Sequence, residues 1–242
     1  MAAMGLEGLR GTWRIRSWWG EYLEQCWFLV SVTALPVFLI SIPLGATISL
    51  QVGDLARQLG AQSATGSVIV VAIVQQVAPL ATAVLIAGAG GSAISADMGS
   101  RRIRSELDAM EVMGVNPAFR LVTPRLWAAT TVSVLLVSLV VLSGVSGGFV
   151  FNVLVQGVSP GAYIDGATQL LTLPDLYQSL FKAAVFGFMA ATVACAKGMT
   201  CEIGPIGVGR AVNRAVVQTF VLVFAANFVI STVYVALVPQ RL

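Results

Sequence analysis

Long stretches without a charged residue dominate the chain. Five intervals carry no Asp, Glu, Lys or Arg: residues 25–53, 58–96, 126–164, 183–196 and 215–240. A helix needs about 20 apolar residues to cross a bilayer, and all but the fourth interval are long enough alone. The fourth reaches that length if residues 176–182 join it, with Lys182 snorkelling near one end or facing protein.

These intervals predict an all-α integral membrane protein with five spans. A transmembrane barrel would instead alternate apolar and polar residues in segments of about 10. Six spans are the alternative, because the second and third intervals are unusually long, but residues 58–66 and 156–164 are polar enough to be loops. The expected spans are about 27–50, 67–95, 126–152, 176–196 and 215–238.

Basic residues between the spans predict the orientation. With five spans, the N-terminus, residues 97–125 and residues 197–214 share one side and carry eleven of the 14 Lys and Arg residues. Lys and Arg accumulate in cytoplasmic loops. We therefore expect a cytoplasmic N-terminus and a C-terminus outside, in the cytoplasmic (inner) membrane of a cell.

The N-terminal 25 residues mix arginines with tryptophans. This mixture predicts an amphipathic helix lying in the cytoplasmic interface, residues 1–25, before a five-span domain of residues 26–242. An aromatic belt at the start of the first span is the alternative. Pro36 and Pro43 lie inside that span, where each favours a kink.

Composition narrows the possible chemistry. The chain is 57% hydrophobic and only 10% charged, far below the roughly 25% of soluble domains. It has no histidine, and its three cysteines form no CxxC pair. We therefore predict no catalytic residue, no metal site, no resident cofactor and no nucleic-acid partner.

The segment 97–125 is unusually charged for this chain. Ile103, Leu107 and Met110 recur at helical spacing beside a charged stripe, and Arg104 and Asp108 are placed to form an i,i+4 pair. Gly114 and the residues after it end the pattern. We predict an amphipathic cytoplasmic helix at about 101–113, between spans two and three, which docks a soluble partner; a merely solvated loop helix is the alternative.

Glycine and amide positions in the spans need separate interpretations. Residues 88–93 match GxGxxA, but a dinucleotide site needs a preceding strand, so the small residues recurring every four positions from Ala83 to Gly99 indicate close helix packing. No Walker A motif is present. Gln75, Gln76 and Asn227 are the intramembrane polar candidates, either lining a cavity or bonding to a neighbouring helix.

Residues 91–99 (GSAISADMG) and 106–117 (ELDAMEVMGVNP) together resemble the signature of the MlaE/YrbE permeases of lipid-transporting ABC systems. Leu50-Gln51, Pro79, Pro124-Arg125 and residues 204–212 fit the same pattern, so the resemblance covers about residues 30–235. It implies a transport subunit and not an enzyme. It also implies a partner ATPase dimer that binds ATP and Mg, a second permease subunit, and MCE-domain proteins on the outer side.

The resemblance assigns the predicted helix at 101–113 the role of a coupling helix that fits a groove on the ATPase. The candidate ATPase-coupling residues are Arg101, Arg104, Glu106, Asp108, Glu111 and Met113.

Departures from the family pattern concern the lipid. Gln75-Gln76 stand where the family often has Arg-Glu, and Ala89 where it often has Arg, which resembles one half of a YrbE heterodimer in an Mce system. Without a fixed cation, we expect a lipid with a small polar head, such as a sterol, fatty acid or mycolic acid. The candidate lipid-binding residues are Ile40, Leu44, Ile48, Gln75 and Gln76. A membrane-embedded lipid-modifying enzyme and an ion-coupled secondary transporter are the alternatives.

Overall fold

The computed structural model describes residues 19–58, 60 and 65–237. The predicted interfacial helix at 1–25 therefore lies mostly outside the described residues. The described remainder, from Trp19, continues without a break into the first long helix, α2 (Trp19–Gln58). Pro36 and Pro43 lie inside α2 and do not end it.

Within the described residues, five helical stretches are long and apolar enough to cross a membrane, which confirms the five-span prediction. The first is α2, and the fourth and fifth are α9 (Leu173–Met199) and α10 (Pro205–Leu237). The second, Thr65–Ile103, runs through α3 (Thr65–Ala72), η3 (Ile73–Val77), α4 (Ala78–Leu85), η4 (Ile86–Gly90) and α5 (Gly91–Ile103). The third, Ala118–Leu154, joins η5 (Ala118–Val122) to α7 (Thr123–Leu154).

Two short helices lie between the long ones. The helix α6 (Glu106–Val112) follows the second span, and α8 (Pro160–Leu170) follows the third. Residues 156–164 were expected to be loop throughout, and this is wrong from Pro160 onward. Proline is favoured at the first position of a helix, because its missing N–H would have no intrahelical partner there.

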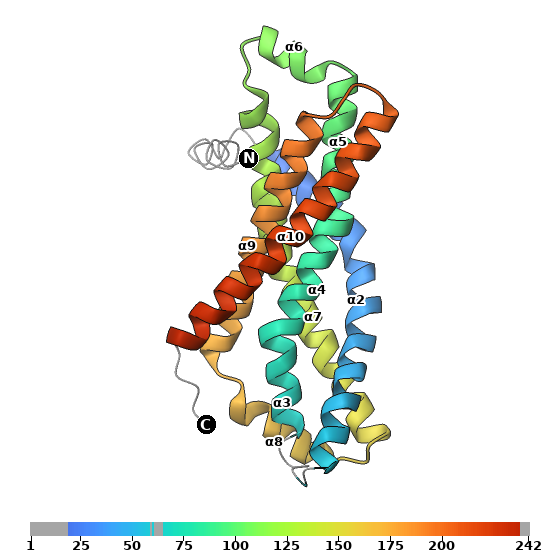
Figure 1. Ribbon diagram of the computed structural model, residues 1–242, viewed down its shortest axis with the longest axis vertical. Helices are drawn as coiled ribbons and strands as arrows, with labels where there is room; N and C mark the ends of the chain where they lie inside the picture. The colour runs from blue at the N-terminus through green and yellow to red at the C-terminus, as the bar shows by residue number, and fades with distance from the viewer. Residues whose placement is uncertain (1–18, 59, 61–64, 238–242) are drawn as a thin grey trace. The chain divides into compact units, whose positions relative to one another are not determined.

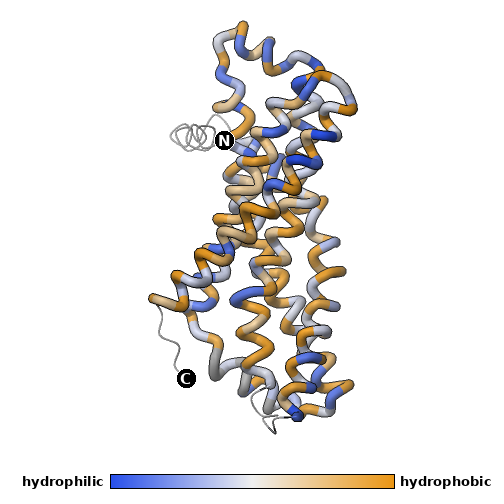
Figure 2. The backbone as a smooth tube through the Cα atoms, in the orientation of Figure 1, coloured by the Kyte–Doolittle hydropathy of each residue, from blue (hydrophilic) through white to orange (hydrophobic). Residues whose placement is uncertain are grey.

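Apolar residues follow the long helices, as Figure 2 shows in orange, whereas hydrophilic residues gather around α6 and the adjoining end of α5. The described chain divides into two compact units. Among the described residues, the first contains 19–33, 83–133 and 184–237, and the second 34–58, 60, 65–82 and 134–183. The long helices α2, α7 and α9 each contribute residues to both.

In the first unit, α5 packs along α10 (Figure 1). The small residues predicted to pack closely are all buried: Ala83, Ala87, Gly91, Ser95 and Gly99. A side chain added at Gly99 would approach Val208 to 2.9 Å, so only glycine allows this approach without a shift. Ala83, Phe186 and Val223 form a buried cluster that joins three helices of this unit.

In the second unit, α3 packs against α8 (Figure 1). Ile69, Val70, Ile73, Val74 and Tyr163 form its buried apolar cluster. Gly45 on α2 meets the backbone of Gly144 on α7 so closely that a side chain there would collide with it. Gly144 and Gly148 therefore serve close helix packing, as their GxxxG spacing predicts.

Candidate functional site

The helix α6 starts at a strained residue. Ser105 adopts a left-handed backbone conformation with φ of 56°, which ends α5 and turns the chain into α6. Glu106 and Asp108 lie in the first turn of α6, where their charge complements the helix dipole. Gly114, with φ of 74°, follows the last turn in the conformation that glycine favours after a helix.

The predicted single helix at 101–113 is therefore wrong at its N-terminal third. Residues 101–103 belong to α5, and only 106–112 form a separate helix. The expected Arg104–Asp108 pair is also wrong, because the break at Ser105 changes the register. Arg104 instead contacts Glu106 at 2.8 Å, and Asp108 pairs with Arg102 at 3.3 Å.

The side chains of α6 divide into one anchor and a broad exposed face. Leu107 is 2% exposed and anchors the helix, whereas Val112 is 89% exposed and Met113 is 71% exposed. Asp108 and Glu111 are also exposed. We call Asp108, Glu111, Val112 and Met113 the α6 face; it combines carboxylates with apolar side chains, next to Arg101 and Arg104 at the end of α5.

An ion-pair cluster lies in the same unit as α6. The fully buried guanidinium of Arg125, on α7, contacts Asp97 of α5 at 2.6 Å and Glu21 of α2 at 3.5 Å, and donates to the Leu121 carbonyl at 2.7 Å. We call Arg125, Asp97 and Glu21 the Arg125 cluster. It joins the helices before and after α6 to the start of α2. Sequence reasoning missed it, although Asp97 and Arg125 each border a charge-free interval.

A second polar cluster lies in the second unit, at the π-helical turn η3. Gln75 donates from its amide to Asp175 at 2.8 Å and accepts from the Lys182 ammonium through its backbone carbonyl at 2.9 Å. Asp175 also accepts from the N–H and hydroxyl of Thr172. We call Gln75, Asp175, Lys182 and Thr172 the Gln75 cluster. Lys182 is fully buried, so it faces protein, one of its two expected positions.

The other predicted lipid-binding residues are spread over the second unit. Ile40 and Leu44 are exposed on α2, at 42% and 37%. Ile48 packs against the buried apolar cluster, and Gln76 is exposed although it follows the partly buried Gln75. The structure therefore does not gather these side chains at one site, and their role in lipid binding stays a prediction.

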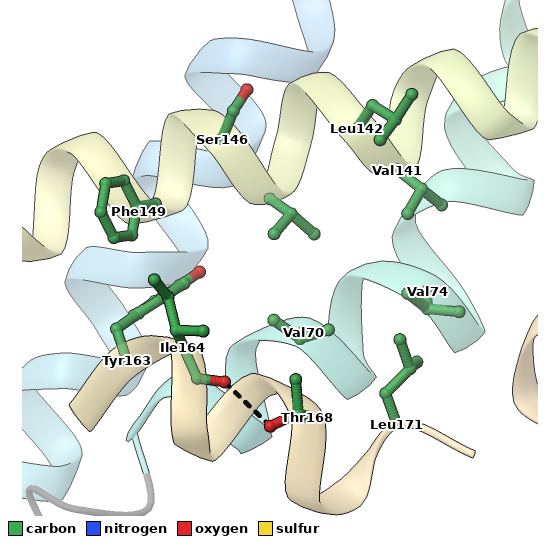
Figure 3. Close-up of a pocket in the computed structure, with 11 residues that line it drawn as sticks. Val70, Val74, Val141, Leu142, Ser146, Phe149, Tyr163, Ile164, Thr168 and Leu171 are labelled. Atoms are coloured by element: carbon green, nitrogen blue, oxygen red, sulfur yellow. Dashed lines mark hydrogen bonds between the residues drawn. The ribbon is translucent and has the colours of Figure 1, made fainter. Parts of the chain in front are cut away.

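The second unit does contain an apolar groove of about 600 Å³. Figure 3 shows side chains of α7 along one wall and side chains of η3, α3 and α8 along the other. The lining residues are Val70, Val74, Val141, Leu142, Val145, Ser146, Phe149, Tyr163, Ile164, Thr168 and Leu171. Sequence reasoning missed this groove because α8 begins in residues 156–164, a stretch that was expected to be loop.

Tyr163 is the largest polar side chain of the groove. It is 2% exposed, and its ring meets Phe149 edge-on with centroids 5.5 Å apart. Burial raises the pKa of Tyr163 to about 12, so the phenol is neutral at physiological pH. Among the described residues, its hydroxyl has no hydrogen-bond partner.

The fold and these sites define an all-α, multi-pass membrane protein with an exposed charged helix between its second and third spans. Residues 22–233 match the family model of Permease MlaE, which is most of the chain. The chain therefore belongs to the MlaE permease family.

Named relatives agree with this assignment. A probable ABC transporter permease protein of Synechocystis is 32% identical over 188 residues, covering 78% of this chain and 72% of the relative. The intermembrane phospholipid transport system permease protein MlaE of Haemophilus influenzae is 25% identical, covering 93% and 87%. Protein TRIGALACTOSYLDIACYLGLYCEROL 1 of Arabidopsis thaliana chloroplasts is 29% identical, covering 73% and 51%.

Membership in this family makes the chain an ABC transporter permease of the inner membrane, related to a phospholipid transport permease. An ABC permease is a transport subunit that pairs with another permease subunit and works with a separate ATPase.

Proposed function

We propose that this chain moves lipids with a small polar head across the cytoplasmic membrane, as one half of a permease pair driven by a partner ATPase. The observation that carries the proposal is the α6 face, exposed in a chain of the MlaE permease family. ATP and Mg would be held by the partner.

The α6 face has the chemistry of a docking surface. Interfaces between proteins combine an apolar centre with a polar rim. Val112 and Met113 supply exposed apolar surface outside the long spans, and Asp108 and Glu111 supply charge beside it. The Arg125 cluster lies on the helices that lead into and out of α6, so it is suited to transmit a displacement of α6 to the spans.

The permease pair has a candidate contact helix in α10. Only 6% of its most apolar stretch is buried within the chain, against 61% for the second span. Since the family-typical charges at Gln75, Gln76 and Ala89 are absent here, we favour a heterodimer with a second YrbE-type subunit over a homodimer. MCE-domain proteins would bind on the outer side, in an Mce-like system.

The preference for a small polar head rests on accessible charge. An anionic headgroup at membrane depth needs a fixed cation. In the described part of the second unit, Lys182 is the one lysine or arginine that lies next to Gln75. Its side chain is fully buried and its ammonium donates to the Gln75 backbone carbonyl. Fatty acids, mycolic acids and sterols therefore fit better than a diacyl phospholipid, with Ile40, Leu44 and Ile48 as candidate contacts.

Orientation follows from the basic-residue bias. We propose that α6 faces the cytoplasm and that the C-terminus lies outside. A reporter fused at Ser105 should then read as cytoplasmic, and one fused after Leu242 as external. Both reporters on one side would contradict the topology without bearing on the family.

One experiment separates this proposal from its alternatives. The chain is purified from its native membrane with its partners, and ATPase activity and co-purifying lipids are measured. We expect a co-purified ATPase and a single-chain or sterol-like lipid. A dominant diacyl phospholipid would overturn the headgroup proposal. Lipid conversion without ATPase would favour the enzyme, and transport that follows an ion gradient alone would favour the ion-coupled transporter.

A further inference from the structure

Seven charged side chains of the first unit form an alternating chain that extends beyond the Arg125 cluster. In order along it, they are Arg104, Glu106, Arg101, Asp97, Arg125, Glu21 and Arg120. We call these seven residues the charge chain. We propose that Asp97 is the positioning residue at its centre, through which a displacement of α6 moves the helices that carry Arg125 and Glu21. The inference deepens the proposed function, on which it rests for the ATPase that displaces α6.

Two carboxylates near α6 each divide their two oxygens between two arginines. In Glu106, Oε1 lies 2.8 Å from Nε of Arg104 and Oε2 lies 3.6 Å from Nη1 of Arg101. In Asp97, Oδ1 lies 3.3 Å from Nε of the same Arg101 and Oδ2 lies 2.6 Å from Nη2 of Arg125. Hydrogen bonds between ionised groups are roughly twice as strong as neutral ones, and the 2.6 Å contact is of this kind. Because both oxygens are engaged, a shift of one arginine alters the contact of the carboxylate with the other.

The ion pairs of Glu106 bridge a turn that would otherwise act as a swivel. Ser105 separates α5 from α6, and the non-helical residues 113–116 separate α6 from the third span. Without a bridge, rotation about these residues would absorb a displacement of α6. Glu106 opposes that rotation, because it lies after the turn and is held by Arg101 and Arg104, which lie before it.

The far end of the charge chain repeats the arrangement. In Glu21, Oε1 lies 3.5 Å from Arg125 and Oε2 lies 3.9 Å from Arg120. Glu21 lies in the first turn of α2, Arg120 in η5 and Arg125 in α7. Among the ion pairs of the described residues, those of Asp97 are the ones that join this end to the α6 end. Asp97 therefore connects α6 with the starts of the first and third spans.

Burial differs along the charge chain in a way that favours movement as a unit. The side chain of Arg125 is 0% exposed, whereas those of Asp97 and Glu106 are 32% and 34% exposed. A buried cation that loses its carboxylates cannot regain hydration, so Arg125 follows Asp97 and does not separate from it. Exposed pairs alone contribute little, so the contact between Asp97 and Arg125 is the step on which transmission depends.

The first test uses the full chain in phosphatidylcholine nanodiscs without ATP, with hydrogen exchange read by mass spectrometry. Glu106→Gln perturbs the α6 end, and we expect it to accelerate exchange about fivefold in α6 and at least twofold in η5, at the far end. An asparagine at position 97 presents an NH₂ to one of the two arginines and so breaks the bridge. In an Asp97→Asn background, Glu106→Gln should therefore still accelerate exchange in α6 and no longer change it in η5.

This remote response separates transmission from a merely structural role, because unconnected sites act additively. Glu202→Gln is the matched control, since Glu202 pairs with Arg210 at an exposed site outside the charge chain. It should leave exchange in α6 and η5 unchanged in either background. If Asp97→Asn does not fold, Arg101→Gln breaks the same link from the α6 side and is measured in its place.

The second test uses the chain with its co-purified ATPase in proteoliposomes. Asp97→Asn should keep ATP hydrolysis within twofold of the wild type and reduce ATP-dependent transfer of a fluorescent fatty acid at least fivefold. Asp97→Glu retains two carboxylate oxygens and should recover at least half of the transfer. The control Glu202→Gln should preserve both activities.

An η5 response to Glu106→Gln that is the same with and without Asp97 would overturn the proposal. So would wild-type transfer in Asp97→Asn, or a parallel loss of hydrolysis and transfer, which would make Asp97 a structural residue. The exchange experiment needs no ATPase, so its failure leaves the proposed function intact. Absence of an ATPase from the purified complex would contradict the proposed function and leave the exchange result standing.

Discussion

The two compact units hold their buried polar groups in different ways. In the first unit, the buried Arg125 meets two carboxylates that keep contact with solvent, since the side chains of Asp97 and Glu21 are 32% and 21% exposed. In the second unit, Lys182 and Asp175 are both buried, at 0% and 5% exposure, and share Gln75 as a neutral partner.

The difference in solvent exposure between the two clusters agrees with the part of the molecule that lies next to each of them. Charge pairs near water can rearrange, because exposed carboxylates regain hydration when a contact breaks; the Arg125 cluster lies on the helices around α6, where movement is required by the proposed coupling. A buried network that is fully hydrogen-bonded rigidifies its surroundings. The Gln75 cluster lies beside the groove, next in sequence to the lining residues Val74 and Leu171.

Removing Arg125 should have the largest effect. Arg125→Met leaves Asp97 and Glu21 without their shared cation, and we expect a loss of about 3 kcal/mol in the free energy of unfolding, at the lower end for broken buried pairs because both carboxylates are partly hydrated. Denaturant unfolding in detergent measures it. Arg210→Met is the control, because Arg210 and Glu202 form an exposed pair; it should change stability by less than about 1 kcal/mol. If Arg125→Met and Arg210→Met lost equal amounts of unfolding free energy, the proposed difference between the buried and the exposed ion pair would be contradicted.

Asp175→Asn should have an intermediate effect. An amide can replace one acceptor but places an NH₂ against the donors of Gln75 and Thr172, so we expect a loss of about 1–3 kcal/mol. Hydrogen exchange should accelerate around residues 171–182 and not in α6. The control Asp165→Asn, exposed on α8, should leave exchange unchanged. Faster hydrogen exchange in α6 after Asp175→Asn would contradict the expectation that the two units respond independently to the loss of a buried contact.

Ser105→Gly should have the smallest effect and the opposite sign. Glycine adopts the left-handed conformation at no steric cost, but it also loses more chain entropy on folding. We expect stabilisation of at most about 1 kcal/mol. Ser105→Val, with a β-branched side chain at the same φ, should destabilise instead. If thermal melting showed valine tolerated as well as glycine, the break between α5 and α6 would not depend on this residue.

The positions of the five spans could be predicted from the sequence because they depend on local composition. Charge-free intervals located all five long helices, and the four-residue repeat of small residues correctly predicted the buried stripe from Ala83 to Gly99. The ends of the helices were harder to predict. The helix α2 extends to Gln58, beyond the expected residue 50, because an apolar stretch marks the part of a helix that can cross a membrane and not the residue at which the helix ends.

Features that depend on a single backbone angle, or on contacts between residues far apart in the sequence, could not be predicted. The left-handed conformation of Ser105 divides a stretch whose periodicity is helical throughout, so the N-terminal third of the predicted helix at 101–113 and its Arg104–Asp108 pair were both wrong. The Arg125 cluster joins residues as far apart as Glu21 and Arg125, and the groove needs α8 folded against α3. No local pattern signals such contacts.

The central claim is that α6 couples a partner ATPase to lipid movement. The chain and its co-purified partners are reconstituted in proteoliposomes, and ATP hydrolysis and transfer of a fluorescent fatty acid are followed together. The account predicts that Asp108→Lys with Glu111→Lys on the α6 face abolishes ATP-dependent transfer and releases the ATPase, while the exposed control Glu202→Lys preserves both. Wild-type hydrolysis and transfer in the α6 double variant would contradict it.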